Sequence, residues 1–202
     1  EFYQVGIQFD YQLTEKGWKW NSGAFALEDL PIPSLPLPNA ATALMALGVS
    51  ELQISDINIV NGLSRARLAG RMQILQTGPE IVLDVAHNPH SAQYLVERVK
   101  CQYADKNIRV VVAMLHDKDI KATIETLAPI TTKWYPASLT GPRAATADDL
   151  CQHLPDGLAQ FQTPVAAFES AKNHATQDDV ILVVGSFHTV GEVLAHWQSN
   201  NE

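Results

Sequence analysis

The sequence predicts an α/β fold: a Rossmann-like domain with a mostly parallel sheet, preceded by a smaller segment of strands and then helices. Two observations carry this prediction. After residue 71, apolar runs without polar alternation are followed by helical patterns, which is typical of strands buried on both faces. Before residue 31, short aromatic and β-branched runs are separated by glycines, which favours antiparallel hairpins.

The N-terminal segment is expected to contain hairpins, a connector and two helices. Its strand-like runs are FYQVGIQFDYQL, KGWKWN and GAFALEDL, and its opening on Glu1 suggests a piece of a longer protein. PIPSLPLPN then holds four prolines in nine residues, which predicts an extended connector because proline fixes the backbone and removes donors. Asn39 is the expected N-cap of a helix in AATALMALGV, and Ser55 that of a second, shorter helix.

The C-terminal segment repeats strand and helix in regular order. The expected strands are EIVLDVA, IRVVVAML, TKWYPAS and DVILVVGS. The expected helices are PHSAQYLVERVKCQY, KDIKATIETLAPI, TADDLCQHL, PVAAFESAKNHA and FHTVGEVLAHWQ. A charged stretch, LSRARLAGRM, separates the two patterns, so we expect a linker at 63–70 and two domains, 1–66 and 67–202.

Composition narrows the class of protein. Hydrophobic residues make up 46% of the 202 residues, enough for a packed core, and the formal charge of -8 argues against a nucleic-acid partner. No apolar run approaches the ~20 residues that a membrane span needs. The two cysteines lie far apart, which disfavours a zinc–thiolate site and fits reduced thiols. We therefore expect a cytoplasmic protein that binds neither nucleic acid nor a membrane. We also expect it to be a monomer, although none of these observations bears on its oligomeric state.

The end of the first strand in the C-terminal segment carries the densest group of polar residues, in IVLDVAHNPH. Ligands bind at the carboxyl ends of strands in open α/β sheets. There Asp84 can accept hydrogen bonds from ribose hydroxyls, and His87 can donate to a phosphate or a carboxylate. Asn88 can cap a helix that Pro89 begins, and such a helix start favours an anion. Taken alone, the pattern fits a simple cap and turn equally well.

Other strand ends and the linker add candidates, each with a structural alternative. Arg71 beside Gly70 suits a phosphate or an ordinary ion pair between domains. Ser186 is expected to cap the last helix whatever its function. Lys118 and Arg143 can each neutralise a carboxylate or lie on a solvated surface. Three further histidines are interpreted as having no functional role, namely His153, His174 and His196.

Two other types of site have less support in the sequence. A metal site, as in a metal-dependent hydrolase, would use Asp84, His87 and His116, but the histidines come from separate loops and form no H-E-x-x-H pattern. A dinucleotide site lacks its basis, because no G-x-G-x-x-G follows the strand. We therefore expect no metal site built from protein ligands alone.

Five motifs in order carry a resemblance to a known family: GRMQIL, IVLDVAHNPHSAQYL, VVAMLHDKD, TGPRAAT and ILVVGSFHTV, with LPLPNAATALMAL upstream. Together they resemble the bacterial bifunctional folylpolyglutamate synthase/dihydrofolate synthase family of the Mur ligase superfamily, over essentially the whole chain. The resemblance implies that 67–202 is a Mur ligase C-terminal glutamate-ligase domain. It implies that 1–66 is the incomplete C-terminal end of the ATP-binding domain.

The resemblance implies an activity and its cofactors. Family members use ATP and Mg²⁺ to phosphorylate the carboxylate of dihydropteroate, or the γ-carboxylate of a folate's glutamate chain. L-glutamate then attacks the acyl phosphate, forming an amide bond. The alternatives that remain are a non-catalytic nucleotide-binding α/β module and a metal-dependent hydrolase.

The resemblance also implies roles for individual residues. For ATP, Asn39 would approach the adenine, Arg71 the phosphates and Asp84 the ribose. His87 would lie near the phosphates as the catalytic residue. Ser186 and Lys118 would contact the incoming glutamate. The family's ATPase domain begins with a P-loop that ends in Gly-Lys-Ser/Thr, and this sequence contains none, so the chain alone is expected to be inactive.

Overall fold

The computed structural model describes residues 1–23, 25–50 and 52–201, and it divides into two compact units, Glu1–Leu68 and Ala69–Glu202. The division lies two residues after the boundary expected from the sequence. Arg67 explains the difference, because its guanidinium donates hydrogen bonds to Ser34 and to the carbonyl oxygens of Ser64 and Ala66. These bonds hold the end of the expected linker within the first unit.

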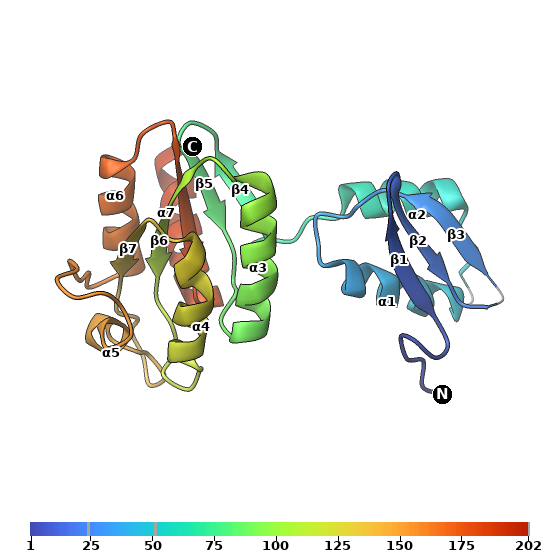
Figure 1. The fold of residues 1–202 in the computed structure, drawn as a ribbon, viewed down its shortest axis with the longest axis horizontal. Coiled ribbons are helices and arrows are strands. Elements are labelled where there is room, and N and C mark those ends of the chain that lie inside the picture. Colours follow the sequence, from blue (N-terminus) through green and yellow to red (C-terminus); the bar gives the residue numbers. More distant parts are fainter. Residues whose placement is uncertain (24, 51, 202) are drawn as a thin grey trace. The chain divides into compact units, whose positions relative to one another are not determined.

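The N-terminal unit begins with a three-stranded antiparallel sheet in the order β1-β2-β3, as the hairpin pattern predicts (Figure 1). Its strands are β1 (Asp10–Thr14), β2 (Gly17–Asn21) and β3 (Ala26–Leu30). The opening EFYQVG is not a strand, contrary to expectation, and only an isolated bridge joins Val5 to Phe9. Ala24, which falls in the third expected run, lies outside the described residues.

Two helices, α1 (Leu37–Gly48) and α2 (Asp56–Arg65), share a core with this sheet. Trp20 is fully buried in this core, and its indole nitrogen donates a 3.0 Å hydrogen bond to the carbonyl oxygen of Ala41 in α1. The prediction that Asn39 caps α1 is wrong, because the helix begins at Leu37, two residues before Asn39, and Asn39 lies exposed in its first turn. Proline in that first turn costs no hydrogen bond, which permits the earlier start. Ser55 precedes α2 as expected, without a side-chain cap bond.

The C-terminal unit contains a five-stranded sheet in the order β4-β5-β8-β6-β7 (Figure 1). Neighbouring strands are parallel except for the edge pair β4 and β5, which is antiparallel. This is the mostly parallel α/β sheet that the sequence predicts, with β4 as an addition that the sequence did not indicate. The strands are β4 (Gln73–Gln76), β5 (Glu80–Leu83), β6 (Asn107–Val112), β7 (Lys133–Pro136) and β8 (Asp179–Val184).

Helices cover both faces of this sheet. The residues of β8 alternate between two buried clusters: Leu182 packs with α3 and α4, and Val183 packs with α6 and α7. Both faces are therefore apolar, which explains the absence of polar alternation in the strands. The helices are α3 (Pro89–Gln102), α4 (Ile120–Leu127), α5 (Ala147–Cys151), α6 (Pro164–His174) and α7 (Phe187–Asn201), with a 3-10 turn at Ala128–Ile130.

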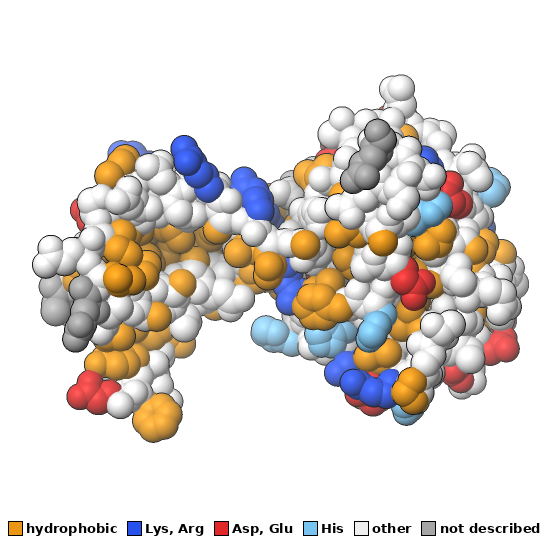
Figure 2. Space-filling model, turned by 180° about the vertical axis from the view of Figure 1, so that it is seen from behind, with side chains coloured by type: hydrophobic (Ala, Val, Ile, Leu, Met, Phe, Trp, Pro, Cys, Tyr) orange, Lys and Arg blue, Asp and Glu red, His pale blue; other side chains and the backbone are white. Residues whose placement is uncertain are grey.

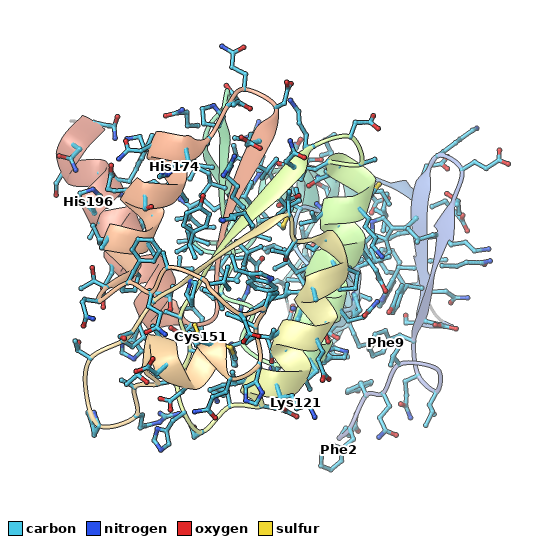
Figure 3. The ribbon with its side chains drawn as sticks, turned by 60° about the vertical axis from the view of Figure 1, so that its left-hand side comes forward. Phe2, Phe9, Lys121, Cys151, His174 and His196 are labelled. Atoms are coloured by element: carbon cyan, nitrogen blue, oxygen red, sulfur yellow. The ribbon has the colours of Figure 1, made fainter. Side chains whose placement is uncertain are left out.

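Two of the histidines interpreted as non-functional lie on the outer helices, α6 and α7 (Figure 3). His196 Nε2 lies 2.9 Å from the Glu169 carboxylate and so joins α7 to α6. His174 Nδ1 contacts the carbonyl oxygen of Ser170 one turn earlier in its own helix. Across the described ranges, no helix combines the length and the apolar character needed to cross a membrane.

Candidate functional site

The order of the strands identifies where a ligand site is expected. β5 and β8 are adjacent and parallel, yet the helices that follow them, α3 and α7, pack on opposite faces of the sheet (Figure 1). Such a switch point is where open α/β sheets bind ligands, at the carboxyl ends of the strands. We call this region the β5–β8 edge, and define it by Gly70–Met72, Asp84–His87 and Gly185–His188.

Asp84, directly after β5, is only 8% exposed. Its Oδ2 accepts a 2.9 Å hydrogen bond from the backbone nitrogen of Met72, and its Oδ1 accepts one of the same length from Ala86. Burial raises the pKa of this carboxyl above its ordinary value, against the opposing effects of the two hydrogen bonds and the nearby Arg71 charge. Asp84 therefore holds two backbone segments, and each oxygen keeps further acceptor capacity for a ligand.

Gly70 brings the segment that carries Arg71 against β5. Its carbonyl oxygen accepts a 2.8 Å hydrogen bond from Val85, and its φ of +68° lies in the left-handed region that glycine adopts readily. A Cβ atom here would lie 2.7 Å from a methyl carbon of Val85. Only glycine allows so close an approach, which places the next residue, Arg71, at the β5–β8 edge.

The Arg71 side chain reaches across to the start of α7. Its guanidinium carbon lies 5.4 Å from the centre of the Phe187 ring, within the range of a cation–π interaction. Phe187 is 62% exposed although it directly follows a buried strand and the buried Ser186. The contact therefore joins residues that precede β4 and follow β8.

His87 has one ring nitrogen committed to the backbone. Its Nδ1 lies 2.8 Å from the carbonyl oxygen of Val85, which can only accept, so Nδ1 carries the proton. In the neutral ring Nε2 is consequently an acceptor, and it becomes a donor only in the imidazolium form. His87 can thus donate to a phosphate only when it is charged.

The predicted cap after β5 is confirmed. Asn88 precedes α3, its Oδ1 accepts a 2.9 Å hydrogen bond from the Ser91 nitrogen, and Pro89 occupies the first turn. In return, the Ser91 hydroxyl oxygen accepts a 3.3 Å hydrogen bond from the backbone nitrogen of Asn88, which completes a capping box. The segment Asp84–Asn88 is therefore fixed at both ends, by a carboxylate and by a helix cap.

Ser186 also caps its helix as predicted, because its hydroxyl oxygen accepts a 3.0 Å hydrogen bond from the Thr189 nitrogen. The Thr189 hydroxyl donates to the carbonyl oxygen of Ala113, at 2.6 Å, and so has no second proton to give. In the 2.7 Å contact between the two hydroxyls, Ser186 must therefore be the donor. The one proton of Ser186 is used inside the protein, and its hydroxyl cannot donate to a ligand unless this relay opens.

Lys118 follows β6 and is paired with a neighbouring carboxylate. Its Nζ lies 3.8 Å from Oδ2 of Asp117, and the same oxygen accepts a hydrogen bond from Arg143. The Arg143 hydrogen bond holds the pKa of the Asp117 carboxyl below its ordinary value. Lys118 and Arg143, which the sequence suggested as partners of a carboxylate, are thus both paired with the Asp117 carboxylate of the same chain.

Asn39 lies in the other unit. Asn39 lines an apolar pocket of about 310 Å³ together with Leu44 and Leu63. This pocket lies between α1, α2 and the proline-rich connector that precedes α1. The pocket is almost wholly apolar, with Asn58 as the second amide in its wall. The structure thus groups Arg71, Asp84 and His87 with Ser186 in one unit, and it describes Asn39 with the other.

The residues considered for a hydrolase site do not assemble one. Within 1–23, 25–50 and 52–201, no three side chains of the His, Cys, Asp or Glu type gather at metal-binding distance. Asp84 is engaged with backbone nitrogens and His87 with a backbone oxygen, while His116 is exposed on a different loop.

Sequence reasoning missed two residues in or directly beside the β5–β8 edge. Thr189 stands three positions after Ser186, the spacing of a reciprocal cap, and that spacing was a usable signal. No signal in the sequence pointed to Phe187, because its partner Arg71 is remote in the sequence. Their contact depends on the pairing of β5 with β8.

This chain is similar in sequence and in fold to known proteins. Residues 70–187 match the family model "Mur ligase, glutamate ligase domain". The chain is 43% identical, over 94% of its length, to the dihydrofolate synthase/folylpolyglutamate synthase of Escherichia coli K12. It spans 44% of that relative, so the match concerns somewhat less than half of the longer protein.

Two solved structures are similarly close. A structure of E. coli FolC in complex with DHPP and ADP has a TM-score of 0.92 and 41% identity, covering 98% of this chain and 48% of that one. A bifunctional folylpolyglutamate synthase/dihydrofolate synthase with Mn, AMPPNP and L-glutamate bound has a TM-score of 0.91 and 43% identity, with the same coverage. The family match extends over more than half of this chain and includes the β5–β8 edge except for His188. The chain therefore belongs to the Mur ligase family, through its glutamate ligase domain.

Proposed function

We propose that this chain forms part of an enzyme that ligates L-glutamate, at the expense of ATP, to dihydropteroate or to the γ-carboxylate of folate polyglutamates. The C-terminal unit, 67–202 in the sequence-based division, would be the glutamate-ligase domain. The relatives named above, one with ADP and DHPP and another with AMPPNP, Mn and L-glutamate, support this assignment.

The observation that carries the proposal is the placement of Arg71. Its guanidinium is fixed at the β5–β8 edge by a backbone bonded to Asp84 and Val85, and by the ring of Phe187. A planar, permanently charged group at a strand switch point is suited to bind a polyphosphate.

The chemistry requires a leaving group on an unreactive carboxylate. A carboxylate oxygen of the acceptor attacks the γ-phosphorus of ATP, ADP departs, and an acyl phosphate forms. The glutamate amine then attacks the acyl carbon, and inorganic phosphate leaves with the electron pair of the broken C–O bond. In the first step Arg71 would stabilise the negative charge on the transferring phosphoryl group.

Asp84 and His87 would bind different parts of the nucleotide, the ribose and a phosphate. Asp84 would accept a bond from a ribose hydroxyl with the acceptor capacity that its two backbone partners leave. His87, as imidazolium, would donate through Nε2 to a phosphate oxygen while its Nδ1 remains on Val85. Both roles need the segment from Asp84 to Asn88 to be rigid, as its capping box makes it.

Glutamate would bind beside α7 and the loop after β6. Ser186 donates its proton to Thr189, which in turn donates to Ala113. Ser186 would therefore act indirectly, by fixing the start of α7. Lys118 would pair with a glutamate carboxylate in exchange for its present partner Asp117. This exchange is favoured by the proximity of a second cation, Arg143.

Magnesium would assist phosphoryl transfer by neutralising the phosphates, but the residues described here do not fit a complete site for it. They contain no cluster of three candidate ligands. The binding of ATP with its metal would then require protein groups other than these residues. The isolated chain would therefore not turn over ATP.

The N-terminal unit would be the end of an ATP-binding domain, with Asn39 near the adenine at the apolar pocket. The large amount of exposed apolar surface on this unit supports such a role, since monomeric domains rarely expose so much (Figure 2). The exposed large apolar residues of this unit include Phe2, Val5, Ile7, Leu13, Phe25, Ile32, Val49, Leu52 and Ile57. We further propose a monomer that acts in the cytoplasm and binds neither nucleic acid nor a membrane.

Calorimetric titration of the 202-residue chain with ATP, L-glutamate and Zn²⁺ separately tests the class. Binding of glutamate, with or without weak nucleotide binding, supports the ligase. Binding of nucleotide alone favours a non-catalytic nucleotide module, and tight binding of zinc favours a hydrolase. Arg71→Met should abolish nucleotide binding, whereas Arg67→Met, which alters an arginine bonded within the N-terminal unit, should not. A folate-dependent ATPase rate in the isolated chain would refute its predicted inactivity.

A further inference from the structure

We propose that Phe187 is a positioning residue, which holds the guanidinium of Arg71 in the orientation that binds a polyphosphate at the β5–β8 edge. This inference rests on the proposed function and deepens it, by assigning the residue that fixes the phosphate-binding cation.

The first support is the contrast between the exposure of Phe187 and its surroundings. Every residue from Asp179 to Ser186 is buried, yet the ring of Phe187 is 62% exposed. Burying a phenylalanine side chain contributes ~2 kcal/mol, and this position gives up most of that contribution. The ring instead presents its face to Arg71, with the guanidinium carbon 5.4 Å from the ring centre.

The second support is that both partners stand on rigid anchors. Phe187 begins α7, whose start is tied to the end of β6 through Ser186, Thr189 and the carbonyl oxygen of Ala113. The backbone of Arg71 lies between Gly70, bonded to Val85, and Met72, bonded to Asp84. The ring therefore fixes the flexible end of an arginine whose backbone is already fixed.

The third support is electrostatic. The negative face of the ring attracts the cation without neutralising it, because the ring carries a quadrupole and no net charge. A carboxylate at the same place would compete with a phosphate for the guanidinium, as Asp117 would for Arg143. An aromatic partner restricts the side chain and leaves its N–H groups for an anion, which lowers the entropy lost on binding.

The contact itself is tested by NMR on the 202-residue chain. The ring current of Phe187 should shift the δ-methylene and Nε–H protons of Arg71 upfield, and Phe187→Leu should remove the shift. Phe2→Leu is the matched control, because it removes a 93% exposed ring from the N-terminal unit. Equal Arg71 shifts in the native chain and in Phe187→Leu would overturn the inference.

The positioning role is tested by titration with inorganic triphosphate. Phe187→Leu should weaken binding about two- to fivefold, the range expected of an exposed cation–π contact. Phe187→Tyr and Phe187→Trp should retain it, and successive fluorination of the Phe187 ring should weaken binding stepwise. A role in packing alone would not respond to fluorination, since the ring keeps nearly the same shape.

The two proposals fail in different ways. If the native chain binds triphosphate and Phe187→Leu binds it equally well, the positioning role is overturned and the proposed function stands. If the native chain binds no triphosphate although the Arg71 shift is present, the phosphate-binding assignment of Arg71 is overturned, and the positioning role falls with it. Stepwise weakening with fluorination, with no change in Phe2→Leu, supports both.

Discussion

The carboxylate of Asp84 and the backbone nitrogen of Met72 are joined by a 2.9 Å hydrogen bond between segments that flank the β4–β5 hairpin. Through this bond the residue expected to contact a ribose also holds the residue next to the phosphate-binding arginine. The structure therefore makes the placement of Arg71 depend on Asp84, so that changes at Asp84 should affect both stability and anion binding.

Removing the Asp84 side chain should destabilise the C-terminal unit. Asp84→Ala leaves the nitrogens of Met72 and Ala86 without their acceptor, at a cost on the order of 3 kcal/mol. Urea unfolding followed by the NMR signals of the buried strand β8 measures this unit by itself. Asp105→Ala, which removes an exposed carboxylate, is the control and should unfold at nearly the native urea concentration. Equal midpoints for the two variants would refute the anchoring role.

The titration of Asp84 should appear in the pH dependence of stability. Because burial raises its folded-state pKa above the ordinary 3.8, the folded chain binds the proton more tightly than the unfolded chain does. Its contribution to the free energy of unfolding is therefore full below pH 3.8 and declines as the pH rises through the folded-state pKa. Asp84→Asn does not titrate, so the difference in unfolding free energy between the native chain and this variant should shrink over that window. A difference that grows with pH would contradict the raised pKa.

Gly70 should not tolerate even the smallest side chain. Gly70→Ala combines a φ of +68° with a Cβ atom 2.7 Å from Val85 and 3.1 Å from Val190. The left-handed backbone alone costs about 1–2 kcal/mol, and the collision adds to that cost. Gly157→Ala is the matched control, because its φ is +75° and nothing lies within 4 Å of the added carbon. We expect Gly70→Ala to lose more unfolding free energy than the control, and to bind triphosphate more weakly.

The sheet shows what the sequence can and cannot predict. The apolar run of β8 predicts a strand buried on both faces, which its residues confirm. Nothing in the run indicates that β8 inserts between β5 and β6, because that order depends on pairings between distant segments. The edge strand β4 was not predicted because QILQ is short and half polar, and it lies at the end of the sheet, where it pairs with β5.

The site shows a similar division. Asp84 and Ser186 were identifiable because each follows a buried strand, and parallel strands end at a common edge. That Met72 engages the Asp84 carboxylate was not predictable, since this partner follows from three-dimensional placement, whereas the spacing of Ser186 and Thr189 was a usable signal for their contact. The sequence indicates which residues are near a site, and the structure distinguishes those free to bind from those that hold others in place.

The hydroxyl relay at α7 predicts an indirect effect on glutamate binding. Thr189→Val keeps the size of the side chain but removes the donor to Ala113 and the acceptor for Ser186, at a cost of about 1–3 kcal/mol. If Ser186 acts by fixing α7, Thr189→Val and Ser186→Ala should weaken glutamate binding alike. Thr126→Val, which removes a hydroxyl bonded one turn back in α4, is the control and should leave glutamate affinity unchanged. Loss of binding in Ser186→Ala alone would indicate a direct contact.

The shared carboxylate of Asp117 predicts an increase in affinity on mutation. Its pKa is held below the ordinary value by Arg143, so it is ionised at neutral pH and competes with glutamate for Lys118 and Arg143. Asp117→Asn removes the competing charge while preserving the shape, and should therefore tighten L-glutamate binding measured by calorimetry. Lys118→Met should weaken it.

The pair Lys121 and Glu125 provides the control for these changes. They form an ion pair along α4, and both side chains are exposed. Glu125→Gln therefore removes the carboxylate partner of a lysine that does not belong to the loop after β6. This variant should leave glutamate affinity unchanged. If Asp117→Asn instead weakens binding, the carboxylate positions Lys118 for glutamate, and the competition between the two anions is refuted.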